Sequence, residues 1–431
     1  MPRAIVYGAG VGGLCAAARL AHAGWEVTLL ERLGHVGGRW SSRDVEGFIL
    51  PTGAFLIAMD DPLAETFEEL EVEFPVRPIE ERTVYLVGGE LVGTGERGGL
   101  RALVEAASAR DGSDPQRMMQ VVRGAIKGDI IASDQPLPVW LETQGAGVDV
   151  RAAFRSITQA WMALNPEEVR ADAFFEYLRA QAGRGHHGIP PEGSRRLAEN
   201  LAEHVRQQGG EVRLNARVAG LTATDGRVDG VALLHGERLS ADVVVSGIGV
   251  TATASMLPEG LAAQLPPESD VLTAPGITCY IASREPFFRH PAVVTVGTRC
   301  VCLVSTPTLV APELAPEGWH YTETISTFAS STDDSDAKGE LERHLADVDD
   351  LLPGWRENGR LLKHQTYRGA WPVYRAWPGH DPQDRLPVPG LALVGDSVKA
   401  PGLAGTGASA ESARLVVGAI LAGAGERVAP S

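Results

Sequence analysis

Three closely spaced glycines near the start of the chain have the spacing of a phosphate-binding turn. Gly8, Gly10 and Gly13 follow a short β-prone apolar run at residues 4–7 and open an alanine-rich segment at residues 14–23 that is typical of a helix. Gly8 allows a tight turn, Gly10 lets backbone amides approach a pyrophosphate, and Gly13 lets the helix pack closely on the strand. The first N–H groups of that helix then offer a partial positive charge to the phosphates.

An acidic residue follows at the position where a ribose would be recognised. A second apolar strand at residues 26–30 ends in Glu31, which lies 18 residues after Gly13. A carboxylate at this position accepts hydrogen bonds from both ribose hydroxyls, whereas the 2′-phosphate of NADP calls for a base. A glycine turn alone would be weak evidence, because 50 of the 431 residues are glycine. The order strand, glycine turn, helix, strand, acid predicts a site for FAD or NAD rather than a merely structural turn.

The segment after Glu31 distinguishes a site for FAD from a site for NAD. A plain NAD-binding domain would enter its second helix here, but residues 32–40 form a glycine-rich loop, Arg-Leu-Gly-His-Val-Gly-Gly-Arg-Trp. Such a loop can lie flat along an extended cofactor and bring Arg39 to it. The loop therefore favours FAD.

At this point the sequence resembles the flavoprotein family of phytoene desaturases, carotenoid isomerases, protoporphyrinogen oxidases and monoamine oxidases. The family continues the dinucleotide motif with Glu, Arg, four residues and Gly-Gly-Arg, and Glu31, Arg32 and residues 37–39 match it. Residues 47–54 resemble the Asp-x-Gly-Pro segment of the family, with Pro51 in place of the acid and Ala54 in place of the proline. The resemblance covers nearly the whole chain and is specific for FAD.

A second motif of the same family lies more than 350 residues later. An apolar run at residues 391–396 ends in Gly395-Asp396, and the small residues at 401–408 lead into a helix that we expect to run to Leu421. The resemblance implies that Asp396 holds the ribityl or pyrophosphate part of FAD and that the helix N-terminus approaches the N1–O2 edge of the flavin. The positive end of a helix there would stabilise the charge gained on reduction.

The resemblance also places Val218 against the adenine and the turn at Ser246-Gly247 near the cofactor. No cysteine lies where monoamine oxidases attach their flavin covalently, so we expect non-covalent FAD. The full set of expected FAD-binding residues is Gly8, Gly10, Gly13, Glu31, Arg32, Gly38, Arg39, Trp40, Gly53, Val218, Gly247, Gly395, Asp396, Gly405, Thr406 and Gly407.

Four residues are candidates for the catalytic side of the site. Trp371 and Tyr374 lie before the Gly-Asp strand at a distance similar to that of a Trp and a Tyr in amine oxidases, where they form an aromatic wall against the flavin. Such a pair could orient an amine or a conjugated chain by stacking or cation–π contact; packing beside a proline turn is the alternative for Trp371. Arg39 and Lys399 are the other candidates, and for Lys399, one of four lysines, a surface position is the competing interpretation.

The order of the motifs predicts an α/β fold with a Rossmann-like FAD-binding domain built from discontinuous segments. We assign residues 1–75, 190–250 and 385–431 to this domain. Residues 76–189 and 251–384 are then two insertions that form a substrate domain with a mixed antiparallel sheet and helices. An aromatic-rich helical stretch, residues 140–177, is expected to form a helical core, some of whose side chains line an apolar substrate cavity.

Periodicity predicts the main elements within these segments. Helices are expected at residues 61–70, 98–110, 193–208 and 336–352, and a β-hairpin at 83–92. One strand is expected over residues 212–218, followed by hairpin turns at 225–226 and 235–236 and a buried strand at 241–247. Further β-prone runs are residues 277–282, 293–305 and 320–328.

The composition of the chain limits the kinds of partner that the protein is expected to bind. The formal charge of −16 disfavours nucleic acid or an anionic membrane surface. No run of about 18 apolar residues would span a membrane, and Met1-Pro2-Arg3 leaves no room for a signal peptide before the first strand. Four scattered cysteines are expected to be buried free thiols, which agrees with a cytoplasmic location. His186-His187 has no third ligand nearby, so we expect a solvated loop rather than a metal site.

These observations predict an FAD-dependent oxidoreductase. We expect it to dehydrogenate a C–C or C–N bond of a small to medium, partly apolar substrate by hydride transfer to flavin N5, with positioning doing most of the work. A role in specialised metabolism is favoured, because the chain is shorter than a typical carotenoid desaturase. Oxygen, a quinone or a nicotinamide would accept the electrons, and a homodimer is an open alternative to a monomer.

Two other functions are compatible with the resemblance. The flavin could serve a redox-neutral double-bond isomerisation, as in the related isomerases. The same fold also carries a non-enzymatic binding protein without flavin, the GDP-dissociation inhibitor of Rab GTPases. The retention of Glu31, residues 37–39 and Gly395-Asp396 argues against the second alternative.

Overall fold

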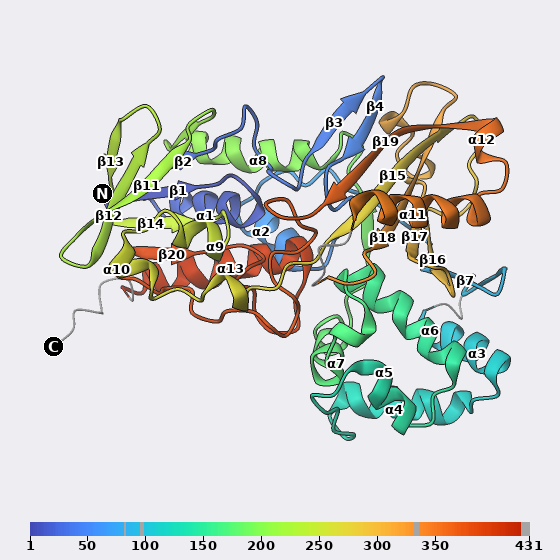
Figure 1. The fold of residues 1–431 in the computed structure, drawn as a ribbon. Helices are drawn as coiled ribbons and strands as arrows, with labels where there is room; N and C mark the ends of the chain where they lie inside the picture. The colour runs from blue at the N-terminus through green and yellow to red at the C-terminus, as the bar shows by residue number, and fades with distance from the viewer. Residues whose placement is uncertain (82, 95–98, 332–335, 424–431) are drawn as a thin grey trace.

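A parallel five-stranded sheet and a larger mixed sheet lie side by side in the computed structural model, which describes residues 1–81, 83–94, 99–331 and 336–423 (Figure 1). The order of the first sheet is β10-β2-β1-β14-β20, and all its neighbouring strands are parallel. Its strands are β1 (Arg3–Tyr7), β2 (Glu26–Leu30), β10 (Glu211–Arg213), β14 (Val243–Ser246) and β20 (Leu391–Leu393). Strands β1, β14 and β20 are near-continuous apolar runs, as expected where both faces of a sheet are covered, whereas the edge strand β10 carries Glu211 and Arg213.

Alternate residues of β1 show how the two faces are filled. Ala4 and Val6 pack with helices α1 (Val11–His22), α8 (Ser194–Gln207) and α13 (Gly405–Leu421). Ile5 and Tyr7 face the small antiparallel sheet of β11 (Val218–Thr224), β12 (Arg227–Leu233) and β13 (Arg238–Ser240). The two expected hairpin turns connect these three strands. Helix α2 (Pro62–Glu69) packs on α13.

The expected single strand at 212–218 is wrong. Strand β10 ends at Arg213 in the parallel sheet, and β11 begins at Val218 in the antiparallel sheet. Asn215, between them, has a φ of 55°, a left-handed conformation that cannot continue a strand. The alternation of apolar residues across this segment therefore conceals a corner, at which the chain leaves one sheet for the other.

The second sheet has seven strands in the order β19-β15-β18-β17-β16-β7-β8. The predicted hairpin at 83–92 forms β7 and β8, and β7 joins the sheet by parallel pairing with β16. The run at 293–305 is not one strand but the antiparallel pair β16 and β17. The strands are β7 (Val84–Val87), β8 (Glu90–Val92), β15 (Gly276–Ser283), β16 (Ala292–Val296), β17 (Val301–Ser305), β18 (His320–Thr327) and β19 (Gly359–Tyr367).

Helices cover both faces of this sheet. Tyr280 and Leu303 face a core shared with the helices of the first insertion, which gather on one side of the sheet in Figure 1. These helices are α3 (Leu100–Asp111), α4 (Pro115–Lys127), α5 (Leu137–Thr143), α6 (Val148–Ile157) and α7 (Ala171–Ala180). Ile281 and Val301 face the opposite side, where α11 (Ala337–Leu351) and α12 (Trp355–Asn358) pack.

Short elements complete the described chain. They are the hairpin β3 (Ser42–Val45) and β4 (Phe48–Pro51), the sheet of β5 (Ile57–Ala58), β6 (Arg77–Pro78) and β9 (His187–Ile189), and helices α9 (Val250–Ala254) and α10 (Glu259–Ala262). Single turns occur at Thr158–Met162, Pro166–Glu168, Glu268–Asp270, Pro307–Leu309 and Pro312–Leu314. All four cysteines are buried and free, as expected. Among the helices of the described residues, none has the length and apolar character needed to cross a bilayer.

Candidate active site

A cavity of about 1260 Å³ extends from the carboxyl ends of the parallel strands to the seven-stranded sheet. Ligands of open α/β folds bind outside the carboxyl ends of such strands. Pockets for single small ligands measure roughly 300–1,000 Å³, so this cavity has room for a large cofactor and a second molecule. Every expected FAD-binding residue lines it except Gly13.

The three glycines of the first motif have different roles in the structure. A Cβ on Gly13 would lie 1.9 Å from the carbonyl oxygen of Gly8, so Gly13 is needed for helix α1 to pack against the turn. Gly8 has a φ of 91°, and a Cβ there would approach Ile248 Cγ2 to 2.6 Å. A Cβ on Gly10 would meet no atom within 4 Å. Gly10 therefore borders open space in the cavity, where a phosphate can approach the backbone.

Two helices begin at the wall of the cavity without a side-chain cap. Gly10 is the N-cap of α1 and Ala404 is the N-cap of α13, and neither helix has a capping hydrogen bond from a side chain. Val11 and Thr406, in the first turns of the two helices, line the cavity. Unpaired N–H groups at two helix ends make this wall a site for negative charge.

Glu31 is fixed at the end of β2 by backbone amides. Its Oε2 accepts a hydrogen bond of 2.8 Å from Ala9 N–H, and its Oε1 accepts one of 2.8 Å from Leu33 N–H. A carboxylate has about four lone-pair sites, so the carboxyl group can still accept hydroxyl protons. It lines the cavity together with Arg32, and its own carbonyl oxygen accepts a hydrogen bond of 2.8 Å from the backbone N–H of Ala216, which lies between β10 and β11.

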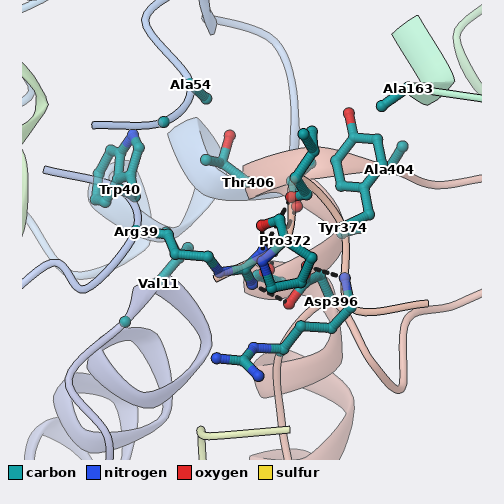
Figure 2. A pocket seen from close by; sticks show the side chains of 18 of the residues that line it. Val11, Arg39, Trp40, Ala54, Ala163, Pro372, Tyr374, Asp396, Ala404 and Thr406 are labelled. Carbon is teal, nitrogen blue, oxygen red and sulfur yellow. Dashed lines mark hydrogen bonds and ion pairs between the residues drawn. The ribbon is translucent and has the colours of Figure 1, made fainter. Parts of the chain in front are cut away.

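Arg39 and Asp396 form an ion pair that joins the N-terminal loop to the C-terminal motif (Figure 2). The guanidinium donates to Asp396 Oδ1 at 2.6 Å and to the carbonyl oxygens of Pro372 and Val373 at 2.9 Å each. Asp396 Oδ2 accepts from the backbone N–H of Arg375 at 2.9 Å. Burial alone would raise the pKa of Asp396, but Arg39 and Arg375 outweigh it and lower the pKa to about 2. The carboxylate is therefore charged and rigidly held.

Trp40 supplies a buried donor that the described chain does not use. Its side chain is 4% exposed and lines the cavity, and its Nε1 has no hydrogen-bond partner within the described residues. In the view of Figure 2, Trp40 and Tyr374 lie on opposite sides of Thr406. A donor left unpaired at a cavity wall, two uncapped helix ends and the open space at Gly10 fit a ligand with phosphates and ring acceptors.

The two aromatic candidates both line the cavity. Trp371 is half-buried, and the Tyr374 hydroxyl donates to the carbonyl oxygen of Trp161 at 3.1 Å. Burial, with a smaller contribution from the nearby charge of Asp396, raises the pKa of Tyr374 to about 12. Trp161 belongs to a π-helical turn, Thr158–Met162, whose irregular backbone exposes this carbonyl group. Tyr374 is thus a neutral, oriented side chain.

The surface interpretation of Lys399 is wrong. Its side chain is fully buried; the ammonium donates to Ala376 O at 2.7 Å and pairs with Asp381. Burial lowers the pKa of Lys399, although Asp381 opposes the shift, and burial raises the pKa of Asp381 to about 6. Lys399 is not among the residues that line the cavity. Lys399 therefore links residues 376–381 to the segment after β20.

The two adjacent histidines are not both in the expected solvated loop, because His187 begins strand β9 and lines the cavity. His186 is exposed and lies 2.9 Å from Asp60, and no group of three potential metal ligands occurs in the described part of the chain. Of the aromatic residues in the stretch 140–177, Trp161 and Tyr177 reach the cavity. Trp140, Phe154, Phe174 and Phe175 pack within the helical core.

Among the ionisable residues that line the cavity, Asp61, Arg375 and Glu323 were not singled out by the sequence reasoning. Asp61 caps α2 through Leu63 and Ala64 N–H, and burial raises its pKa to about 6. Burial and Arg39 lower the pKa of Arg375 to about 10. Glu323 lies in the middle of β18, inside the run expected to be a strand. The available signal for Glu323 was a lone acid between Tyr321 and Ile325 on one face of a β-prone run. Asp61 and Arg375 gave no signal beyond their charge.

Comparisons with known proteins agree with this geometry. A family model described as flavin containing amine oxidoreductase matches residues 11–423. A phytoene desaturase of Rhodobacter capsulatus is 29% identical over 280 residues, which are 57% of this chain and 52% of the desaturase. An uncharacterised protein of Methanocaldococcus jannaschii is 26% identical, over 92% of this chain and 94% of that protein. The chain thus spans about half the length of the desaturase but nearly all of the archaeal protein.

A solved structure of an oxidoreductase from Methanosarcina mazei superposes with a TM-score of 0.84. The two chains are 27% identical, and the superposition covers 97% of this chain and 100% of the other. The family match spans both cavity walls, including the glycine turn from Val11 onward and the Gly395-Asp396 motif. The chain belongs to the flavin-containing amine oxidoreductase family and is an FAD-dependent oxidoreductase.

Proposed function

We propose that the protein dehydrogenates a C–C or C–N bond of a small to medium, partly apolar substrate. The observation that carries this proposal is the continuity of the cavity. The same hollow that holds the FAD-binding residues opens into a chamber walled by the seven-stranded sheet and the first helical insertion. FAD held by residues such as Glu31, Arg39 and Asp396 would supply the oxidant, as the acceptor at N5 of a hydride from a substrate carbon.

The lining of the chamber supports a partly apolar substrate. Aliphatic and aromatic side chains from both insertions line it, among them Ile79, Tyr85, Trp161, Ile277, Val294, Leu303 and Ile325. Their burial excludes water from the reacting bond, and their surfaces bind apolar groups. We assign residues 76–189 and 251–384 to this substrate domain, and residues 1–75, 190–250 and 385–431 to the FAD domain.

In this proposal the chain acts chiefly by positioning. Trp371 and Tyr374 form an aromatic wall that orients the substrate, and the Tyr374 hydroxyl is held by Trp161 O so that the ring cannot turn. Arg39 holds the backbone of residues 372–373 and so ties this wall to Asp396. A correctly oriented pair of reactants needs little further acid–base catalysis.

Anaerobic reduction of the FAD-loaded protein tests the proposal. Amines and conjugated alkenes are added separately, and loss of the absorbance of oxidised flavin is followed. We expect a substrate with an apolar body to bleach the flavin, and Trp371→Ala to slow bleaching while the protein retains its flavin. Trp355→Phe, which alters a buried tryptophan near α11 on the other face of the sheet, is the matched control. A flavin that stays oxidised with every amine and alkene would overturn the proposal.

An isomerase would give a different result in the same experiment. An alkene whose double bond moves, with no net consumption of oxygen, quinone or nicotinamide, would identify a redox-neutral isomerase. Specialised metabolism remains our preferred setting for the reaction, since the chain spans only about half of the desaturase that it matches.

A further inference from the structure

Asp61 is a buried acid that lies between two helices at the wall of the cavity. It is 9% exposed, lines the cavity and is the N-cap of α2. Its Oδ1 accepts hydrogen bonds from the backbone N–H groups of Leu63 at 2.9 Å and Ala64 at 3.2 Å. Its Oδ2 accepts none from the described residues. One oxygen of the carboxyl group is therefore committed to α2, and the other is left unpaired.

The unpaired oxygen lies against the first turn of α13. A Cβ on Gly407 would lie 2.2 Å from Asp61 Oδ2 and 2.8 Å from its Cγ, so glycine at position 407 allows this close approach. Gly407 is the third residue of α13, whose N-cap, Ala404, provides no side-chain hydrogen bond. The carboxyl group therefore packs against the positive end of an uncapped helix, and both border the cavity.

Asp114 shows that capping a helix does not require this burial. It caps α4 with the same geometry, accepting from the N–H groups of Gln116 at 2.9 Å and Arg117 at 3.2 Å. A proline follows each of the two aspartates. Asp114 is exposed, however, and lies outside the cavity lining. Burial of an acid costs free energy, so the position of Asp61 indicates a role beyond the cap.

The surroundings of Asp61 offer it little positive charge. The charged and titratable groups on the elements around it are Cys15 and Arg19 on α1, Glu65 and Glu69 on α2, Asp60, Arg184, His186 and His187 beside β5 and β9, and Glu411 and Arg414 on α13. Three pairs of opposite charge are formed among them: Arg19 with Glu69, His186 with Asp60, and Arg414 with Glu411. Burial raises the pKa of Asp61 to about 6, against smaller opposing effects of its two N–H donors and Arg184. Asp61 can therefore change its charge near neutral pH.

The cofactor gains negative charge at the same wall. The glycine turn and Glu31 fit the nucleotide end of FAD, and the wall continues through Arg39 and Asp396 to Thr406 at the start of α13 (Figure 2). A flavin that extends from the nucleotide end along this wall approaches the helix end that Asp61 contacts. An ionised Asp61 opposes any further negative charge there, because like charges repel strongly where water is excluded.

We propose that reduction of bound FAD is coupled to protonation of Asp61, which thereby acts as a positioning residue for the charge of the cofactor. Reduction adds two electrons and one proton to FAD and so adds one negative charge to the wall. A second proton passes from solvent to Asp61 Oδ2, and the carboxylate becomes a neutral carboxyl group. The negative charge at this wall is therefore the same before and after reduction. This inference rests on FAD binding and not on the bond that the enzyme dehydrogenates.

Redox titration of the FAD-loaded protein tests the coupling without a substrate. The midpoint potential is measured with dithionite and reference dyes from pH 5 to pH 9 for wild type, Asp61→Asn and Asp114→Asn. A slope of about 30 mV per pH unit corresponds to one proton per two electrons, and twice that slope to two protons. We expect the steeper slope in wild type and Asp114→Asn above about pH 6, where Asp61 is ionised in the oxidised protein, and the shallower slope in Asp61→Asn.

The substitution should also shift the potential itself. At pH 8, where wild type must first protonate Asp61 or tolerate its charge, Asp61→Asn should move the equilibrium roughly tenfold toward reduced FAD, about 30 mV. Asparagine caps helices about as well as aspartate, so we expect the variant to fold and to retain its flavin. Asp61→Ser, which also keeps a capping oxygen, is the second variant and should give the same slope as Asp61→Asn.

Infrared difference spectra identify the group that takes up the proton. On reduction at pH 7.5, the C=O stretching band of a protonated carboxyl group should appear in wild type and in Asp114→Asn and be absent in Asp61→Asn. A purely structural role of Asp61 would change the melting temperature while leaving this band and the slope of the potential unchanged.

Two results would overturn the coupling: equal slopes in wild type and Asp61→Asn between pH 6 and pH 8, or a carboxyl band that persists in Asp61→Asn. Both are independent of the proposed dehydrogenation, because dithionite supplies the electrons. A wild type that shows the coupling, but whose flavin is bleached by no amine or alkene, would overturn the dehydrogenation alone.

Discussion

The ion pair between Arg39 and Asp396 links residues 357 positions apart and closes one wall of the cavity. Only 8% of the Asp396 side chain and 21% of the Arg39 side chain are exposed, so solvent screens this pair weakly. The same arginine holds two backbone carbonyl groups before the aromatic wall. Arg39, which the resemblance places at the cofactor, thus also holds the backbone next to the two aromatic residues on the substrate side.

Replacing Asp396 should reveal a pH-dependent contribution to stability. Its pKa of about 2 in the folded protein lies below the ordinary value of 3.8, so Asp396 stabilises the fold above about pH 4 and loses this effect as the pH falls toward 2. Asp396→Asn should therefore lower the free energy of unfolding by about 2 kcal/mol at pH 7. Urea unfolding at pH 7, 4 and 2 measures the difference, with Glu317→Gln, which alters an exposed acid, as control. A deficit that stays constant from pH 7 to pH 2 would contradict this account.

At the scale of elements, the segment between β19 and β20 is held by Lys399 rather than by regular structure. The ammonium reaches Ala376 O and Asp381 from the turn after β20. Because Lys399 lies outside the cavity lining, we predict a structural rather than a catalytic role for it.

Lys399→Met should weaken the fold without slowing the chemistry. The variant leaves Asp381 buried without its partner, which typically costs 3–5 kcal/mol. We expect a lower unfolding midpoint, together with an unchanged rate of flavin reduction per bound flavin. The double variant Asp381→Asn/Lys399→Met should recover much of the stability, because it removes the stranded charge. Slow reduction in a fully flavin-loaded Lys399→Met protein would assign Lys399 to the chemistry instead.

The glycine turn gives a matched pair of substitutions within one element. Gly13→Ala would place a Cβ 1.9 Å from Gly8 O and should prevent α1 from packing, so little folded protein is expected. Gly10 has an extended backbone, with φ −77° and ψ −177°, and open space at its Cβ position. Gly10→Ala should therefore fold with nearly unchanged stability and bind FAD more weakly, as measured by flavin content after dialysis and by circular dichroism. Equal behaviour of the two variants would contradict these separate roles.

Local sequence patterns predicted most of the helices and strands. The features that were missed depend on contacts between segments that are distant in the sequence. The glycine turn, the hairpin at 83–92 and the helix at residues 405–421 follow from periodicity and turn residues. The corner at Asn215 was missed because its φ of 55° is set by the change of sheet. The parallel pairing of β7 with β16 was missed because it joins segments about 200 residues apart.

The cofactor side of the site was more predictable than the substrate side. Gly8, Glu31 and Asp396 stand in motifs whose spacing carries the chemistry, and all three line the cavity. Glu323 stands in no motif, although it lines the cavity and its Oε2 has no hydrogen-bond partner among the described residues. Burial of Lys399 likewise depends on Asp381, a residue 18 positions away in an irregular segment. The surroundings of Glu323 and Lys399 form only when separate segments of the chain pack together, so local sequence patterns do not reveal them.

At the scale of the whole molecule, a single ligand bound in the cavity would contact segments that are far apart in the sequence. The turn before α1, the loop at residues 32–40 and the start of α13 all line it. Removal of FAD should therefore release these segments together, since a ligand that binds only the folded state adds about 4 kcal/mol of stability at a concentration 1,000 times its Kd.

Hydrogen exchange measured by mass spectrometry, with and without FAD, tests this coupling. We expect faster exchange in α1, residues 32–40 and the first turn of α13 when FAD is removed, with all three segments titrating at one FAD concentration. Helices α11 and α12, which pack on the face of the seven-stranded sheet away from the cavity, serve as the internal control and should change least. Protection confined to α1 would mean that the N-terminal motif binds the nucleotide alone, because a ligand gripped from both ends of the chain must order both at once.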